Sequence, residues 1–163
     1  SILADTYPDW PPRPQALWYL GLLLEQIESK EDSKRWWDTL VERYPDSEEA
    51  AKVQLLRGRR ALKEDQDDLL AIDLLTPVTH RKDIHGATAH YWLAWAQTNL
   101  GHPERALKHF LKAAMATRAG NPPLHRQAVL DSILPFSLQY PNKSGLKTYE
   151  KLAKELHPKH SHR

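Results

Sequence analysis

Hydrophobic residues recur at steps of three and four from Gln15 onward, which is the period of an amphipathic helix. Leu17, Leu20 and Leu24 set this period in the first segment, and similar segments follow along the rest of the chain. No stretch alternates hydrophobic and polar residues over the length of a strand. The pattern therefore predicts an all-α protein of about eight helices with no sheet.

Capping residues and prolines predict where several helices begin or bend. Asp46 with Glu49 fits a capping box for one helix. Asn121 precedes a proline, which fits an N-cap followed by proline at the first helical position. The segment after Asn121 contains Pro135, where we expect a kink. Ser144 is expected to cap the last helix.

The two ends of the chain differ in composition from its middle. Four prolines surround Trp10 within residues 1–14, a density that excludes a helix interior. We therefore expect an extended lead-in over residues 1–14, one helical domain over residues 15–158, and a basic, histidine-containing tail over residues 159–163. No run of 18 apolar residues occurs, so the sequence predicts no membrane insertion.

A unit of two helices repeats with a period of about 36 residues. Leu20-Gly21, Arg57-Gly58 and Leu93-Ala94 align, and each is followed by a polar turn and a second apolar helix. The small residue of each pair lets the partner helix approach closely. Because one helix pair cannot bury its own apolar face, neighbouring pairs must stack. The repeat therefore predicts an α-solenoid of about four tandem helix–turn–helix units.

Two copies of the unit carry a recognisable motif. Residues 88–122 show it most clearly, through Tyr91-Trp92-Leu93-Ala94, Gly101, Ala106, Phe110 and Ala113. Residues 15–47 match through Leu20-Gly21 and Tyr44-Pro45-Asp46, whereas residues 48–82 and 122–158 fit more loosely. The sequence thereby resembles the tetratricopeptide repeat family. This resemblance implies a non-catalytic protein that binds a partner protein or peptide in a concave groove.

A finer resemblance concerns residues 42–50, which read Glu-Arg-Tyr-Pro-Asp-Ser-Glu-Glu-Ala. They are similar to repeats of bacterial envelope tetratricopeptide proteins, including outer-membrane assembly and motility factors. The similarity favours the periplasm or cell envelope over the cytoplasm. It implies a place in an envelope assembly or motility complex.

Groove positions of the tetratricopeptide family lie on the first helix of each unit. Carried over to this sequence, they fall on Trp18, Leu22 and Glu25, on Lys52, Leu55, Arg59 and Lys63, on Tyr91, Trp95 and Asn99, and in the fourth unit on Asp131 and Pro135. Such a row of apolar surfaces and cations suits an extended or helical partner segment with apolar anchors and acidic residues. The alternative interpretation makes Trp18, Tyr91 and Trp95 part of the core between repeats.

The composition offers little for catalysis. The chain has no cysteine, which excludes disulfides, cysteine zinc sites and a cysteine nucleophile. G-x-S-x-G, P-loop and dinucleotide fingerprints are absent. His80, His85 and His90 lie five residues apart rather than at the shorter spacing of helical zinc ligands. We therefore expect no enzymatic activity, no cofactor and no metal site.

Charge is unevenly distributed although the net charge is only +2. Residues 1–50 hold 11 acidic and 5 basic residues, whereas residues 51–163 hold 10 acidic and 18 basic residues. The asymmetry is compatible with an acidic ligand at one end, with head-to-tail homo-oligomers, or with two solvated faces. The basic run Arg57-Gly58-Arg59-Arg60 favours an acidic peptide over nucleic acid, because the whole chain is not strongly basic. Two other functions stay open, namely a head-to-tail structural scaffold and a docking or regulatory domain of a larger enzyme.

Overall fold

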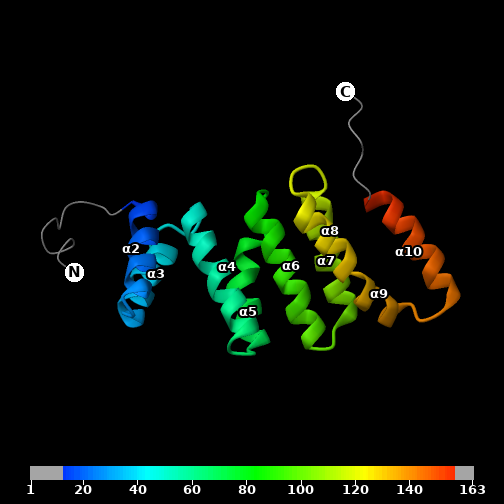
Figure 1. Cartoon of the computed structure of the whole chain (residues 1–163), viewed down its shortest axis with the longest axis horizontal. Coiled ribbons are helices and arrows are strands. Elements are labelled where there is room, and N and C mark those ends of the chain that lie inside the picture. Colours follow the sequence, from blue (N-terminus) through cyan, green and yellow to red (C-terminus); the bar gives the residue numbers. More distant parts are fainter. Residues whose placement is uncertain (1–12, 157–163) are drawn as a thin grey trace, which may run out of the picture. The chain divides into compact units, whose positions relative to one another are not determined.

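The computed structural model describes residues 13–156, apart from several side chains of the last helix (Figure 1). Every regular element in this range is helical; in order they are α2 (Pro14–Gln26), α3 (Lys30–Arg43), α4 (Glu48–Lys63), α5 (Asp68–Leu75), the short 3-10 helix η1 (Thr76–Val78), α6 (Ile84–Asn99), α7 (Pro103–Thr117), α8 (Pro122–Asp131), α9 (Ile133–Gln139) and α10 (Lys143–Leu156). The predicted all-α fold class is confirmed. Of the predicted lead-in, residues 1–12 lie outside the described residues, as does the whole tail over residues 159–163.

The chain divides into two compact units, Ser1–Gln54 and Leu55–Arg163. In the first unit α2 and α3 form a hairpin that closes on Gly21. A Cβ atom at this position would overlap the indole of Trp37. The Ser33 hydroxyl donates a hydrogen bond to the carbonyl of Gly21 over 2.9 Å, and the indole of Trp37 stacks on Trp18 with ring centroids 5.5 Å apart. The predicted role of Gly21 in close helix approach is confirmed.

The second unit repeats this arrangement with other small residues. A Cβ atom at Gly58 of α4 would lie 2.5 Å from the Leu75 side chain of α5, and Ala94 of α6 is fully buried. The core between α4, α5 and α6 consists of small and aliphatic residues, namely Ala61, Leu62, Ala71, Leu75, Leu93 and Ala96. Small side chains bring the helices close enough for this core to exclude water.

The segment after Asn121 breaks one turn earlier than predicted. The N-cap itself is confirmed, because the Asn121 side chain accepts a hydrogen bond from the Leu124 N–H over 3.1 Å. We expected the kink at Pro135, but α8 ends at Asp131 and α9 begins at Ile133, so the break lies at Ser132. Proline has no N–H to donate to the carbonyl of residue i−4, here Asp131, and the interruption therefore falls before the ring. Pro135 sits buried in the first turn of α9.

Two predicted caps were wrong. The helix α4 is capped by Ser47 rather than Asp46, since the Ser47 hydroxyl accepts from the Ala50 N–H over 3.1 Å. Asp46 belongs to the turn before it, which leaves Ser47 as the residue just ahead of the first helical position. Ser144 lies inside the first turn of α10, because the carbonyl of Asn142 already accepts from the Gly145 N–H over 2.9 Å.

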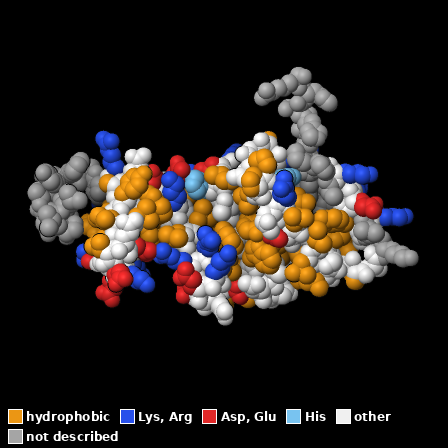
Figure 2. Space-filling view, in the orientation of Figure 1, with side chains coloured by type: hydrophobic (Ala, Val, Ile, Leu, Met, Phe, Trp, Pro, Cys, Tyr) orange, Lys and Arg blue, Asp and Glu red, His pale blue; other side chains and the backbone are white. Residues whose placement is uncertain are grey.

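Hydrophobic side chains gather on the surface of the second unit over α8 and α9 (Figure 2). Large apolar side chains of these helices that are exposed include Leu130, Ile133, Leu134 and Leu138. Leu138 is 61% exposed. An apolar surface of this kind can contribute to association between proteins.

Candidate partner-binding site

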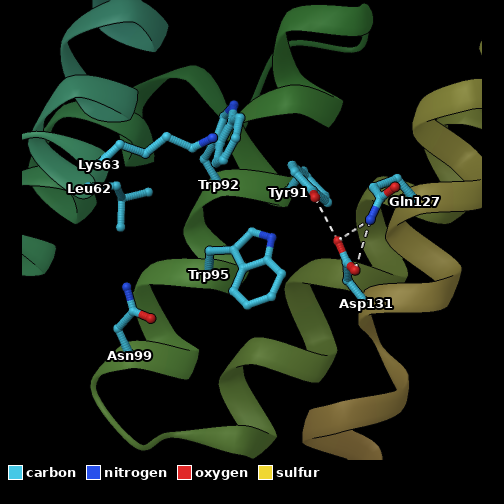
Figure 3. A pocket seen from close by; sticks show the side chains of 8 residues that line it. All are labelled: Leu62, Lys63, Tyr91, Trp92, Trp95, Asn99, Gln127 and Asp131. Atoms are coloured by element: carbon cyan, nitrogen blue, oxygen red, sulfur yellow. Dashed lines mark hydrogen bonds between the residues drawn. The ribbon is translucent and has the colours of Figure 1, made fainter.

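A pocket of about 320 Å³ opens in the second unit between α4, α6 and α8 (Figure 3). It is lined by residues of all three helices, namely Leu62, Lys63, Tyr91, Trp92, Trp95, Asn99, Gln127 and Asp131. We call it the aromatic pocket. The four residues from α6 stand at steps of one, three and four, so they share one broad face of that helix. The helical period therefore places two tryptophans and a tyrosine on a single surface.

Two cations cover the indole of Trp92. Lys63 Nζ lies 4.9 Å from the ring centroid, and Arg59 Cζ lies 5.6 Å from it. Both distances fall within the range of a cation–π interaction. Because Arg59 and Lys63 are four residues apart on α4, one helix turn presents both charges to the same ring.

The opposite end of the aromatic pocket is built around the carboxylate of Asp131. The Tyr91 hydroxyl donates a hydrogen bond to Asp131 Oδ2 over 2.6 Å. The Gln127 amide donates to both carboxylate oxygens over 2.9 Å (Figure 3). Burial, followed by the hydrogen bond to Asp131, raises the pKa of Tyr91 to about 12. The phenol therefore stays protonated at neutral pH and holds the carboxylate in place.

Trp95 belongs to both the pocket wall and the core. Its ring meets the buried ring of Phe110 edge-on, with centroids 5.6 Å apart and an interplanar angle of 89°. Tyr91 packs on the same Phe110 ring at 5.8 Å. Both residues are only partly buried and both line the aromatic pocket. Tyr91 and Trp95 therefore contact the core and also line a pocket.

The structure brings together four residues of the carried-over set, Lys63, Tyr91, Trp95 and Asn99, in the aromatic pocket, with Arg59 beside them. Asn99 also donates a hydrogen bond to Asp68 over 2.9 Å, at the rim of the pocket. Leu55 packs against the apolar core of the second unit instead.

The remaining four residues of that set belong to the first unit. Trp18 stacks on Trp37, and Lys52 pairs with Glu48 over 3.5 Å. Leu22 and Glu25 are partly buried on α2.

Sequence reasoning missed Leu62, Trp92 and Gln127 as pocket residues. Trp92 is the most important of them, and a signal for it existed, because it adjoins Tyr91 in the repeat motif. Asp131 lines the pocket, as the carry-over to the fourth unit indicated, whereas Pro135 is buried within α9. Gln127 and Asp131 lie four residues apart on α8, a spacing at which glutamine and aspartate can hydrogen-bond on one helix face, so the local sequence did carry a signal for this contact.

The described residues of the range 13–156 contain neither a cluster of metal ligands nor a helix suited to span a membrane. Within that range no three His, Asp or Glu side chains cluster as ligands for a metal ion. None of the helices described there combines the length and apolar character needed to cross a bilayer.

One repeat of the chain matches a known family. Residues 15–47, which span α2 and α3, match the family model described as Tetratricopeptide repeat. No curated protein and no solved structure matches the chain. Repeats of this family generally mediate protein–protein interaction, typically as non-catalytic scaffolds. The match, the helical hairpins and the small residues at their crossings support a tetratricopeptide repeat at residues 15–47 within an all-α helical repeat fold.

Proposed function

We propose that the aromatic pocket binds a segment of a partner protein that carries an apolar anchor and an acidic residue. The observation that carries this proposal is Trp92, a partly exposed indole beneath two cations at the mouth of a pocket. Tryptophan, tyrosine and arginine are the residues that most often dominate the energy of protein interfaces. Here all three residue types meet within two turns of α6 and one turn of α4.

The charges of the aromatic pocket support one orientation of the bound segment. Lys63 and Arg59 at the α4 side attract a carboxylate, whereas Asp131 at the α8 side accepts hydrogen bonds from a donor. The apolar anchor then lies between them against Trp95. A segment with an acidic residue at one end and a hydrogen-bond donor at the other fits this order. Such binding needs no cofactor.

A place in a bacterial envelope assembly is the finer part of the proposal. The resemblance of residues 42–50 to repeats of envelope proteins supports it. Fractionation of the source cells tests it: recovery with the envelope or periplasm supports this placement, whereas recovery with the cytoplasm alone contradicts it.

Photocrosslinking from two neighbouring positions tests the pocket itself. Gln127 lines the pocket, whereas Arg126 is exposed on α8 outside it. A photoreactive amino acid at residue 127 should yield a crosslinked protein from source-cell extract, and the same group at residue 126 should not. Adding Lys63→Glu to the residue 127 variant should reduce that adduct. Equal adducts from both positions, or an adduct indifferent to Lys63→Glu, would contradict the proposal.

A further inference from the structure

A second pocket, of about 400 Å³, lies in the second unit and shares no lining residue with the aromatic pocket. It is formed by the loop after η1, the first turns of α6 and one face of α7. On α7, Lys108, Leu111, Lys112 and Met115 follow steps of three, one and three, so they line the pocket from a single helix face. We call this the basic pocket.

Among the residues that the structure describes, the charged side chains lining the basic pocket are all cationic. Arg81 forms an ion pair with Asp83 over 2.7 Å. Lys82, Lys108 and Lys112 are exposed, and among the residues that the structure describes none of the three pairs with a carboxylate. Three like charges around one hollow produce a local positive potential, which attracts anionic groups.

Between these lysines the surface is apolar. Leu111 is partly buried, and Met115 is 53% exposed although it is a large hydrophobic residue. Methionine adapts its flexible side chain to the shape of a ligand. The pocket therefore combines an apolar floor with a cationic rim. A small inorganic anion would contact only the lysines of the rim.

Two histidines stand at the side of the basic pocket. His90 Nδ1 and His109 Nδ1 are 2.9 Å apart, a hydrogen bond that two neutral imidazoles make by sharing one N–H. Burial and the charge of Lys112 lower the pKa of His90, which also hydrogen-bonds the backbone of Thr79. Burial, His90, Lys112 and Lys108 lower the pKa of His109 to about 4. Both imidazoles are therefore uncharged at neutral pH, mainly because they are buried.

We propose that the basic pocket binds an acidic, amphipathic segment of a second partner protein, with an apolar side chain on Leu111 and Met115 and carboxylates at Lys82, Lys108 and Lys112. Charge complementarity selects this occupant, because none of the described residues that line the pocket is acidic. The apolar floor distinguishes it from a simple phosphate site. Together with the aromatic pocket, this site would let one chain hold two different segments.

Binding to the whole chain can be tested by nuclear magnetic resonance titration with blocked peptides. The probe is a peptide in which one leucine is flanked on both sides by glutamates; its controls replace the glutamates with glutamine or the leucine with serine. Carboxylates at the rim stabilise a protonated imidazole, so saturating probe should raise the pKa of His90 and His109. Arg81 and Lys82 of the loop and Lys108 and Lys112 of α7 are the charged groups around them.

The variants decide whether the site is specific. Lys108→Glu combined with Lys112→Glu should weaken probe binding about tenfold. Two exposed lysines that attract the glutamates of the probe are replaced by carboxylates that repel them. Lys147→Glu, an exposed lysine on α10, makes the same type of change elsewhere and should leave binding unchanged. Trp95→Phe in the aromatic pocket should also leave it unchanged, which separates this site from the proposed function.

Several outcomes would overturn the inference. Equal binding of the glutamine peptide would show that charge is not required, and equal binding of the serine peptide would show that the apolar floor is not used. If inorganic phosphate displaces the probe completely at equal concentration, or if a single-stranded oligonucleotide binds more tightly than the probe, the occupant is not an acidic protein segment.

Discussion

Individual side chains of the aromatic pocket carry distinct energetic roles. Arg59 and Lys63 are exposed, so their contacts with Trp92 contribute little to folding and leave both charges available to a ligand. Trp95 differs, because one side of its ring contacts buried Phe110. Stability and binding can therefore be separated at Arg59 but are coupled at Trp95.

At Arg59, reversal of the charge tests binding alone. Arg59→Glu should change the free energy of unfolding by less than about 1 kcal/mol, the value of an exposed cation–π contact. It should weaken binding of the crosslinked partner by about 1–3 kcal/mol, since it removes and reverses a paired charge. Arg126→Glu is the control, and isothermal titration calorimetry with thermal melts measures both quantities. Unchanged partner binding would remove Arg59 from the site.

At Trp95, truncation should affect folding as well. Trp95→Ala should lower the free energy of unfolding by about 3 kcal/mol, because it opens a cavity beside Phe110. Trp95→Phe keeps an aromatic ring there and should cost less than half as much. Chemical denaturation of both variants checks this order. A Trp95→Ala protein as stable as wild type would show that the ring contributes nothing to the core.

The histidine pair makes stability depend on pH. The folded pKa of His109 is about 4, below its ordinary value of 6.5. Between these values the unfolded chain binds a proton that the folded chain does not, so the free energy of unfolding falls as the pH decreases from 6.5 towards 4. His109→Gln should flatten this slope, as measured by denaturation at several pH values. An identical slope in both proteins would exclude His109 as its source.

Glycine, which has no side chain, allows the two helices of a pair to pack closely. At Gly58 an added Cβ would lie 2.5 Å from side-chain atoms of Leu75, so even a methyl group requires that side chain or its helix to shift. At Gly120 no atom lies within 4 Å of such a Cβ. Both glycines belong to the second unit, but Gly58 lies inside α4 whereas Gly120 lies in the turn after α7.

Substitution at these glycines tests the hairpin crossing. Gly58→Ala should destabilise the protein by about 1–3 kcal/mol through overpacking against Leu75. Gly120→Ala should leave stability unchanged or raise it slightly, because alanine reduces the entropy of the unfolded chain. Thermal unfolding followed by circular dichroism measures both. Equal effects would mean that close approach at Gly58 is not what the fold requires.

Over the whole molecule, two features favour association between copies. Acidic residues are concentrated in residues 1–50 and basic residues in the remainder. Exposed apolar side chains on α8 and α9 add a surface that can bury area between proteins. Repeat units ordinarily cover such faces by stacking on a neighbour.

Sedimentation velocity tests this association. We expect self-association at low salt that declines above physiological ionic strength, because exposed charges are screened beyond about 8 Å at 0.15 M. Leu138→Glu should reduce association further, whereas Ser137→Glu adds the same charge beside it and should have a smaller effect. A protein that is monomeric at every salt and protein concentration would remove the head-to-tail scaffold as an alternative function.

Local sequence determined the helices, the Asn121 cap and the small residues at the crossings. These features depend on residues within one or two turns, and the hydrophobic period records them directly. Five positions carried over from the family resemblance, Lys63, Tyr91, Trp95, Asn99 and Asp131, line one pocket, and their role in partner binding stays a prediction. The period predicts the helices and their crossings because each unit packs its two helices through similar residues at equivalent positions.

Only the tertiary structure decided which side chains meet. Arg59 and Lys63, some thirty residues away in sequence, lie over the ring of Trp92. Leu55 packs against the apolar core, and the helix breaks at Ser132 rather than at Pro135. The basic pocket joins a loop to the face of α7. Such contacts depend on rotamers and on the angle between helices, which packing fixes and a one-dimensional pattern does not encode.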